Sequence, residues 1–305
     1  MSVVEFASVT KRFDSVTALD AVSFVVPQGS VFGLLGPNGA GKTTALRLLL
    51  GLSRPTSGTV RILGGDPVNP ASRAKVGFLP DVPGFVDWMT GAEYLSFSAK
   101  LAGAGADATR DAELLELVDL SDAKGRIGGY SRGMRQRLGI AQSLVGSPEL
   151  LVLDEPTSAL DPGGRAVLLD LVDRLREHAT VVFSTHLLDD VERVCDRVLV
   201  IDRGQVLADS TIDELKTHVA GSTVVRLVLD DDGRPLLDSL RTQAWVTSAD
   251  ASAGGRELHI VVGDLNAARV ELPRLCVEAG LGIVALNDDR PGLQDIFLSL
   301  VGGAK

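Results

Sequence analysis

A glycine-rich stretch near the N-terminus has the residue types and the spacing of a phosphate-binding loop. The segment GPNGAGKT fits the pattern G-x-x-x-x-G-K-[ST], in which glycines let backbone N–H groups converge on a phosphate. Lys42 would neutralise phosphate oxygens, and the helical pattern that begins there would point its positive end at the anion. The residues that we expect to bind the phosphates are Gly36, Pro37, Asn38, Gly39, Ala40, Gly41, Lys42, Thr43 and Thr44.

Two adjacent carboxylates follow an apolar run in the middle of the chain. In ELLVLDEP, at 149–156, Asp154 ends a short run typical of a buried strand, and Glu155 comes directly after it. A carboxylate at Asp154 can hold the ligand shell of Mg²⁺, to which the Thr43 hydroxyl would be a further ligand. Glu155 can act as a general base toward an attacking water. With the phosphate loop, this pair predicts a site that binds and hydrolyses a Mg-nucleotide.

Alternating strand and helix patterns must bring these residues together. A β-rich run precedes the glycine loop and the helical pattern KTTALRLLLGL follows it, which is the order of an α/β nucleotide-binding fold. Helical patterns from about Thr90 to Leu120 and at 134–146 indicate an inserted helical lobe. After the carboxylates, helical and extended patterns alternate in GRAVLLDLVDRLREH, TVVFS, LDDVERVCD and RVLVIDRG.

The C-terminal part of the chain has a different pattern. TIDELKTHVAGS is typical of a short connecting helix. Beyond it we expect the order β-α-β-β-α-β, the ferredoxin-like split βαβ arrangement, with one helix added at the end. The expected strands are 223–230, 244–250, 257–263 and 282–288, and the expected helices are 235–242, 266–279 and 293–302.

Composition indicates an ordinary globular protein with one large domain or two smaller ones. The 305 residues are 45% hydrophobic and 23% charged, which allows a sizeable core. The net charge of −10 argues against bulk binding of nucleic acid, so we expect no nucleic-acid partner. Cys195 and Cys276 lie far apart without a CxxC motif, and we expect two thiols in a reducing compartment. Without a signal core or a run of about 18 apolar residues, we expect any membrane-spanning part to be another chain.

Four motifs, in this order and at this spacing, make the chain resemble the ATP-binding subunit of ATP-binding-cassette (ABC) transporters. They are GPNGAGKTT, YSRGMRQR, LLVLDEPTSALDP and STH, and the resemblance covers roughly 1–210. The stretch YSRGMRQRLGIAQSL and the tail GLQDIFLSLVG are similar to the ABC-2 exporter branch, which includes drug and antibiotic export subunits with a C-terminal accessory domain. The resemblance implies ATP and Mg²⁺ as ligands.

The resemblance also implies how the fold is divided. An α/β P-loop ATPase domain would occupy 1–210, with a RecA-like core, an antiparallel β part and a helical subdomain at about 82–147. A linker at 211–222 would lead to a small α+β ferredoxin-like domain at 223–305.

Further site residues carry over from the family's motifs one by one. Phe13 matches the aromatic residue that stacks on adenine. Ser131 and Gly133 keep the signature groups that face phosphate, and His186 falls where the family's histidine contacts the γ-phosphate. Asp161, in SALD, matches the loop that touches the opposite subunit and helps to orient the catalytic glutamate and its water. The resemblance therefore gives His186 a catalytic role beside that of the glutamate.

Three positions depart from the family's pattern. Asp81, in VGFLPD, stands where the family has Gln, or Glu in this branch, directed at Mg²⁺ and water. Because Asp is one methylene shorter, Asp81 would contact the metal directly, reach it through a water, serve only in coupling to the membrane subunit, or only form a turn. In the signature, Arg132 replaces a glycine and Met134 a glutamine, which we interpret as variation within the branch. We expect Arg135 and Arg137 to hold the helical lobe or face solvent rather than bind phosphate.

The resemblance implies two such chains that meet head to tail and enclose two ATP, each site taking its phosphate loop from one subunit and its signature from the other. They would form a homodimer on separate multi-spanning membrane subunits, at the cytoplasmic face of the cell membrane, and power export. Two alternatives remain: a soluble ABC ATPase of translation or DNA maintenance, and a nucleotide-gated regulatory module. The single cassette, the lack of a long coiled-coil insert and the acidic charge disfavour the first. The complete set of catalytic positions disfavours the second.

Overall fold

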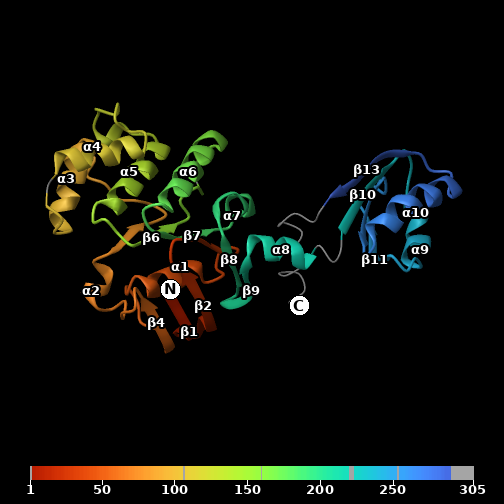
Figure 1. The fold of residues 1–305 in the computed structure, drawn as a ribbon, viewed down its shortest axis with the longest axis horizontal. Helices are drawn as coiled ribbons and strands as arrows, with labels where there is room; N and C mark the ends of the chain where they lie inside the picture. The colour runs from red at the N-terminus through yellow and green to blue at the C-terminus, as the bar shows by residue number, and fades with distance from the viewer. Residues whose placement is uncertain (1, 106, 159, 220–222, 253, 290–305) are drawn as a thin grey trace. The chain divides into compact units, whose positions relative to one another are not determined.

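The phosphate loop directly follows a central strand of a six-stranded sheet (Figure 1). In the computed structural model, the strand order is β5–β6–β7–β3–β8–β9, and only β9, at one edge, runs antiparallel to its neighbour. Every residue of β3, β6 and β7 is buried, as expected for parallel strands covered on both faces. The strands are β3 (Val31–Leu35), β5 (Val76–Leu79), β6 (Leu150–Asp154), β7 (Thr180–Thr185), β8 (Arg197–Asp202) and β9 (Gln205–Thr211).

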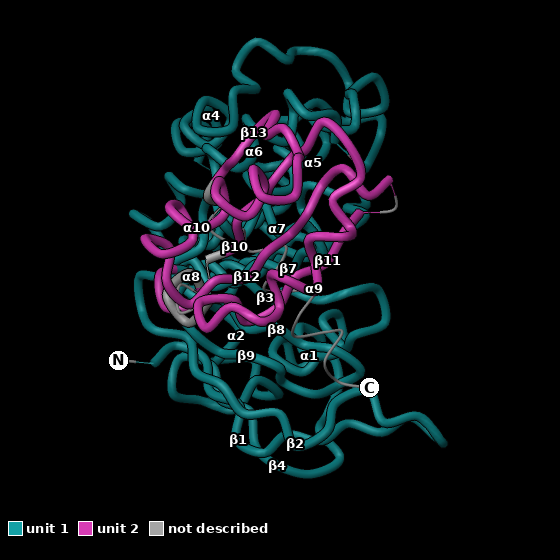
Figure 2. The backbone as a smooth tube through the Cα atoms, turned by 90° about the vertical axis from the view of Figure 1, so that its right-hand side faces the viewer, with its two compact units in different colours: residues 1–212 teal, residues 213–305 magenta. Residues whose placement is uncertain are grey.

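The chain divides into two compact units, 1–212 and 213–305, which Figure 2 shows in two colours. Within them, no described helix combines the length and the apolar character needed to cross a membrane. The residues that the structure describes are 2–105, 107–158, 160–219, 223–252 and 254–289.

A smaller antiparallel sheet packs against the strand that carries the phosphate loop. Phe6 stacks on Phe24 with 4.4 Å between ring centroids, and Phe24 stacks on Phe32 of β3 at 5.6 Å. The same core includes the buried face of helix α1 (Lys42–Leu49). The loop is therefore held between a buried strand and a buried helix face. The strands of the smaller sheet, in the order β2–β1–β4, are β2 (Val16–Pro27), β1 (Ser2–Phe13) and β4 (Ser57–Ile62).

Three helices between β5 and β6 form a lobe of their own (Figure 1). A capping side chain begins each helix, and the caps are Thr90, Asp107 and Ser131. The helical pattern predicted from about 90 to 120 is confirmed. The helix predicted at 134–146 begins earlier, at Arg132, because Ser131 caps it. The helices are α3 (Gly91–Leu101), α4 (Ala108–Leu117) and α5 (Arg132–Leu144), with a 3₁₀ turn at Ile127–Gly129.

Short strands are the elements that the sequence did not reveal. β4, β5 and β9 have no counterpart in the expected series, whereas helices α6 (Pro162–Leu175) and α7 (Leu188–Val194) lie where predicted. β5 has only four residues and contains Gly77, so its sequence has neither the length nor the side chains of a strand pattern. A Cβ at Gly77 would lie 2.1 Å from the carbonyl oxygen of Ser143, so the glycine lets α5 pack directly on β5. A short helix, α2 (Pro70–Arg73), precedes β5.

The second unit has the βαββαβ order that the sequence predicted. Its strands form an antiparallel sheet in the order β11–β12–β10–β13, with the unit's first and third strands in the centre, as in ferredoxin-like folds. Helix α8 (Ile212–Val219) occupies much of the predicted linker, and the predicted helix at 293–302 lies outside the described residues. The other elements are β10 (Thr223–Leu229), α9 (Leu236–Arg241), β11 (Val246–Ala251), β12 (Glu257–Val262), α10 (Leu265–Glu278) and β13 (Ile283–Asp289).

Candidate functional site

The glycine loop makes a tight turn between β3 and α1. Gly41 precedes α1 with a left-handed backbone (φ 111°), and Gly39 also has a positive φ (83°). A Cβ at Gly41 would lie 2.6 Å from the carbonyl oxygen of Ala18, and one at Gly36 would lie 2.2 Å from that of Ile201. The fold of the loop therefore requires glycine at these positions, independently of any ligand.

The loop lines a cleft of about 850 Å³. Segments far apart in the sequence form its other walls, including Val16, Asp81, Asp154 and Glu155. The N-terminus of α1 opens into this cleft, so its backbone dipole favours an anion there. All the expected phosphate-loop residues from Pro37 to Thr44 line the cleft.

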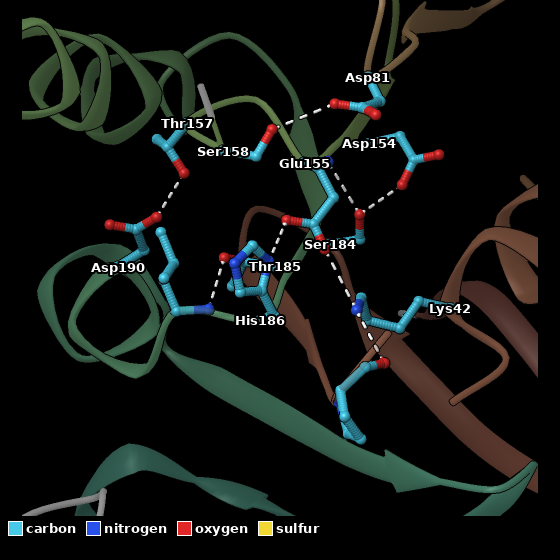
Figure 3. A network of polar contacts seen from close by, with 12 residues as sticks. Lys42, Asp81, Asp154, Glu155, Thr157, Ser158, Ser184, Thr185, His186 and Asp190 are labelled. Atoms are coloured by element: carbon cyan, nitrogen blue, oxygen red, sulfur yellow. Dashed lines mark hydrogen bonds and ion pairs between the residues drawn. The ribbon is translucent and has the colours of Figure 1, made fainter. Parts of the chain in front are cut away.

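Lys42 is a buried cation that is held by the loop and by one carboxylate. Its side chain is 6% exposed, and Nζ donates a hydrogen bond of 2.7 Å to the carbonyl oxygen of Gly36. The same nitrogen lies 3.1 Å from Glu155 Oε1 (Figure 3). Because a buried charge requires a partner, Glu155 is the anion that compensates Lys42 in this structure. A phosphate in the cleft could take over that pairing and leave the Glu155 carboxylate free.

Glu155 bridges Lys42 and His186 (Figure 3). Its Oε2 atom lies 2.8 Å from His186 Nδ1, and its backbone N–H donates to Ser184 Oγ at 2.9 Å. Its backbone φ is 47°, a conformation that a non-glycine residue rarely adopts. The structure thus brings both predicted catalytic side chains together beside the phosphate loop.

Asp154 is a buried carboxylate held by a serine from the neighbouring strand. The Ser184 hydroxyl donates to Asp154 Oδ1 at 2.6 Å, and the Ser184 side chain is fully buried. Burial raises the pKa of Asp154 above its ordinary value, and the bond from Ser184 opposes this rise. The negative charges of Glu155 and Asp81 raise this pKa further, and Lys42 lowers it. A cation that binds beside Asp154 would relieve the cost of its charged form.

Asp81 lines the same cleft from the loop after β5. Its Oδ1 atom accepts a hydrogen bond of 3.1 Å from the Ser158 hydroxyl, in the segment that follows Glu155 (Figure 3). Both side chains are exposed. The structure therefore gives Asp81 a protein partner, and its role as a metal ligand stays a prediction.

A second contact fixes the segment after Glu155 from the opposite side. The Thr157 hydroxyl donates to Asp190 Oδ2, and the Arg165 guanidinium donates to Asp190 Oδ1. Asp190 and Thr157 are 0% and 1% exposed. Sequence reasoning missed this cluster, and its signal is an acidic residue one turn after His186, in LDDVERV.

The signature residues line a different pocket, of about 510 Å³. Ser131 Oγ accepts the backbone N–H of Met134 at 3.2 Å, and Ser131, Arg132, Gly133 and Asp161 all line the pocket. Among the residues described, none lines both this pocket and the phosphate-loop cleft. Arg132 is exposed and forms no ion pair in the described part of the chain. One chain therefore presents its phosphate loop and its signature at separate places.

The two arginines further along the signature hold the helical lobe, as predicted. Arg135 forms an ion pair with Asp87 at 3.1 Å. Arg137 donates to the carbonyl oxygens of Val118 and Asp119, each at 3.0 Å. Both guanidinium groups are thus engaged within the lobe.

Phe13 lies at the end of β1, beside the cleft but not in its wall. Its side chain is 46% exposed, and the Lys11 ammonium lies 4.7 Å from the centre of its ring. Val16, its partner in the strand pairing, does line the cleft. The stacking of Phe13 on adenine stays a prediction.

The oxygen atoms of the cleft suit Mg²⁺ in type. Asp154 supplies a carboxylate and Thr43 a hydroxyl, which are hard donors of the kind that Mg²⁺ prefers. In the described ranges, no three His, Cys, Asp or Glu side chains converge as a metal site of their own. Asp154 and Thr43 therefore fit Mg²⁺ by the type of their donor atoms.

Sequence comparison matches 19–158 to a family model described as ABC transporter. An uncharacterized ABC transporter ATP-binding protein of Bacillus subtilis, YxlF, is 38% identical over 96% of this chain and 98% of its own length. The bacitracin transport ATP-binding protein BcrA of Enterococcus faecalis is 34% identical, over 99% and 97%. The daunorubicin resistance ATP-binding protein DrrA3 of Streptomyces coeruleorubidus is 37% identical, over 96% and 93%.

Solved structures share the fold over about two thirds to three quarters of the chain. The ATP-binding subunit of an ABC transporter has a TM-score of 0.64 at 28% identity, over 72% of this chain and 94% of that one. A dimeric ATP-binding cassette bound to ADP and Pi has a TM-score of 0.62 at 25% identity, over 68% and 98%. The chain therefore belongs to the ATP-binding subunits of ABC transporters, the ATPases that power transport through a membrane partner.

Proposed function

We propose that two copies of this chain bind and hydrolyse Mg-ATP at shared sites and so drive export through a separate multi-spanning membrane subunit. The observation that carries this proposal is the separation of two half-sites in one chain. The phosphate loop and Glu155 line one cleft, and Ser131 and Gly133 line another pocket. A head-to-tail pair of copies would complete each cleft with the other copy's signature. The pair would work at the cytoplasmic face of the membrane.

In the proposed site, the loop holds the substrate before any chemistry occurs. Backbone N–H groups of the loop and the N-terminus of α1 bind the β-phosphate, and Lys42 binds β- and γ-phosphate oxygens. Asp154 and Thr43 would hold Mg²⁺, which supplies charge neutralisation at the phosphate oxygens. In binding phosphate, Lys42 exchanges its contact with Glu155 for a contact with the substrate.

The freed Glu155 carboxylate then acts as the general base. It accepts a proton from a water whose oxygen attacks the γ-phosphorus, while the bond to the β–γ bridging oxygen breaks. His186, 2.8 Å from this carboxylate, orients it and reaches the γ-phosphate. Ser131 and Gly133 of the other copy would bind the γ-phosphate from the opposite side, with the dipole of α5 behind them. Asp161, in the same pocket, would touch the other copy and help to orient Glu155.

The names of the relatives support an antibiotic-like compound as the exported substrate. They refer to bacitracin, linearmycin and daunorubicin, which are chemically different from one another. The membrane subunit would therefore select the compound, and this chain would supply the energy.

A Glu155→Gln variant tests the proposed chemistry. The amide cannot accept the proton, so we expect kcat to fall about 100-fold or more. Because the binding groups remain, we expect ATP to convert this variant from monomer to dimer, as measured by size-exclusion chromatography with light scattering. Glu149→Gln is a matched control, since the Glu149 side chain lies at the surface in an ion pair with Lys75. Wild-type turnover in Glu155→Gln would refute the role given to Glu155.

Membrane association tests the transport partner. Co-expressed with a multi-spanning subunit, the chain should sediment with membranes, and ATP should drive accumulation of an antibiotic in inside-out vesicles. ATPase stimulation by RNA or DNA instead, with no membrane association, would favour a soluble ATPase.

A further inference from the structure

The segment from Pro156 to Ser158, directly after Glu155, is held by contacts of two different kinds. On one side, Thr157 donates to the buried carboxylate of Asp190 in α7. On the other side, Ser158 donates to Asp81 across the surface of the cleft. The first contact excludes water and is costly to break, whereas water can compete for the second.

Asp190 is a fixed anchor because both of its oxygens have partners. Oδ2 accepts the Thr157 hydroxyl and Oδ1 accepts the Arg165 guanidinium of α6. The side chain is 0% exposed, and the two contacts compensate the carboxylate in the interior. Thr157 is therefore held firmly against α7.

A buried amide links the same segment to the helical lobe. Gln136, on α5, is 5% exposed, and its Nε2 donates to the carbonyl oxygen of Pro156 at 3.2 Å. The same nitrogen lies 3.5 Å from the backbone oxygen of Asp81. The loop after β5, the helix behind the signature and the residue next to Glu155 thus meet at one place.

We propose that Asp81 is a positioning residue, which sets the placement of Glu155 through its hydrogen bond with Ser158. The inference rests on the proposed function and concerns how that site is regulated. The Asp81–Ser158 hydrogen bond is the contact that can open. The Thr157–Asp190 contact is the fixed point about which the segment would turn. Movement of the loop after β5 would pull on Ser158 and so turn the Glu155 carboxylate toward or away from the water.

Asp suits this role in this chain. Its short side chain reaches Ser158, whose hydroxyl lies 3.1 Å from Oδ1. The carboxylate accepts this hydrogen bond, and the Ser158 hydroxyl donates it. An asparagine at the same place would keep an oxygen acceptor of the same length, but it would lose the charge. The two roles of Asp81 can therefore be separated, since a metal ligand depends on the charge and this contact depends on the acceptor.

Steady-state ATPase measurements test the proposal. Asp81→Ala and Ser158→Ala should each lower kcat roughly tenfold, because a misaligned Glu155 would lose part of its contribution as general base. Each should leave the KM for ATP within about twofold, because neither side chain would bind substrate. The double variant should be no slower than either single variant, since the two substitutions remove the same hydrogen bond. Asp81→Asn should recover most of kcat.

Magnesium and nucleotide binding supply readouts that do not depend on turnover. The Mg²⁺ concentration for half-maximal binding of a fluorescent ATP analogue should be the same in Asp81→Ala, Asp81→Asn and wild type. Asp122→Ala and Ser121→Ala are matched controls, because both residues are exposed in the helical lobe, away from the cleft. Thermal unfolding should show that all variants fold.

Several results would overturn the proposal. A raised Mg²⁺ requirement in Asp81→Asn would make Asp81 a metal ligand, and additive losses in the double variant would separate Asp81 from Ser158. If Glu155→Gln retains wild-type turnover, the proposed function fails as well. If Glu155→Gln behaves as expected and these variants do not, only this inference fails.

Discussion

Ser184 is a residue whose importance comes from two neighbours and not from any ligand. It donates to the Asp154 carboxylate and accepts the backbone N–H of Glu155, so one buried hydroxyl aligns both acidic residues. The chemistry of the acids was predictable because they are adjacent in LDEP, after an apolar strand. The role of Ser184 was not, because β6 and β7 become neighbours only in the folded sheet.

Removing the Ser184 hydroxyl should have an effect that depends on pH. In Ser184→Ala the Asp154 carboxylate loses a donor, so its pKa rises above the already raised wild-type value. The lost bond stabilises the charged form. The difference in unfolding free energy between wild type and variant should therefore grow as pH rises from the wild-type pKa to the variant's higher one. Above that window we expect a difference of about 1–3 kcal/mol.

Urea unfolding at a series of pH values above 3.8, with a chelator present, measures this difference. The chelator keeps bound cations from obscuring the titration of Asp154. A difference that shrinks as pH rises would contradict the assignment of the bond to the charged carboxylate.

At the scale of elements, the sequence predicted those with strong periodicity and missed those defined by their neighbours. The helices of the lobe were predictable because capping residues and apolar spacing lie within each one. β5 was not, because four residues with a glycine become a strand only by pairing with β6. The hydrogen bond between Asp81 and Ser158 could not be predicted from the sequence either, since it joins two loops that are far apart in the chain.

Helix α5 gives a prediction in which the cap can be separated from the site. Ser131→Asp keeps a side-chain acceptor for the N–H of Met134 and favours the helix dipole, so its thermal stability should stay near wild type. If Ser131 faces a phosphate of the other copy, the added charge should abolish ATP-driven dimers in the Glu155→Gln background.

Ser131→Ala is the complementary variant. It should lose about 1 kcal/mol of stability through the missing cap, while it adds no charge to the pocket. Thermal unfolding and light scattering distinguish the two effects. ATP-dependent dimers of Ser131→Asp would remove Ser131 from the proposed interface.

At the scale of the whole molecule, each compact unit contains one cysteine in its own core. Cys195 lies in the first unit and Cys276 in the second, and both are buried. Burial raises the pKa of both thiols above its ordinary value, so the reactive thiolate is scarce in the folded chain. We expect DTNB to react slowly with native protein at pH 8 and with both thiols in the unfolded chain.

The same thiols can report on unfolding of the two units. Pulsed alkylation across a urea gradient, followed by peptide mass spectrometry, gives a midpoint for each cysteine. Because each unit has a hydrophobic core of its own, we expect two different midpoints. Coincident midpoints would mean that the units unfold as one.

The left-handed backbone at Glu155 has a consequence for how this protein could evolve. A φ of 47° suits glycine or asparagine better than glutamate, by an amount on the order of 1 kcal/mol. Either replacement would relieve this strain, but it would also leave the buried Lys42 ammonium without its anion, at a cost of about 3–5 kcal/mol. Selection for stability alone would therefore retain the glutamate, independently of any selection for transport.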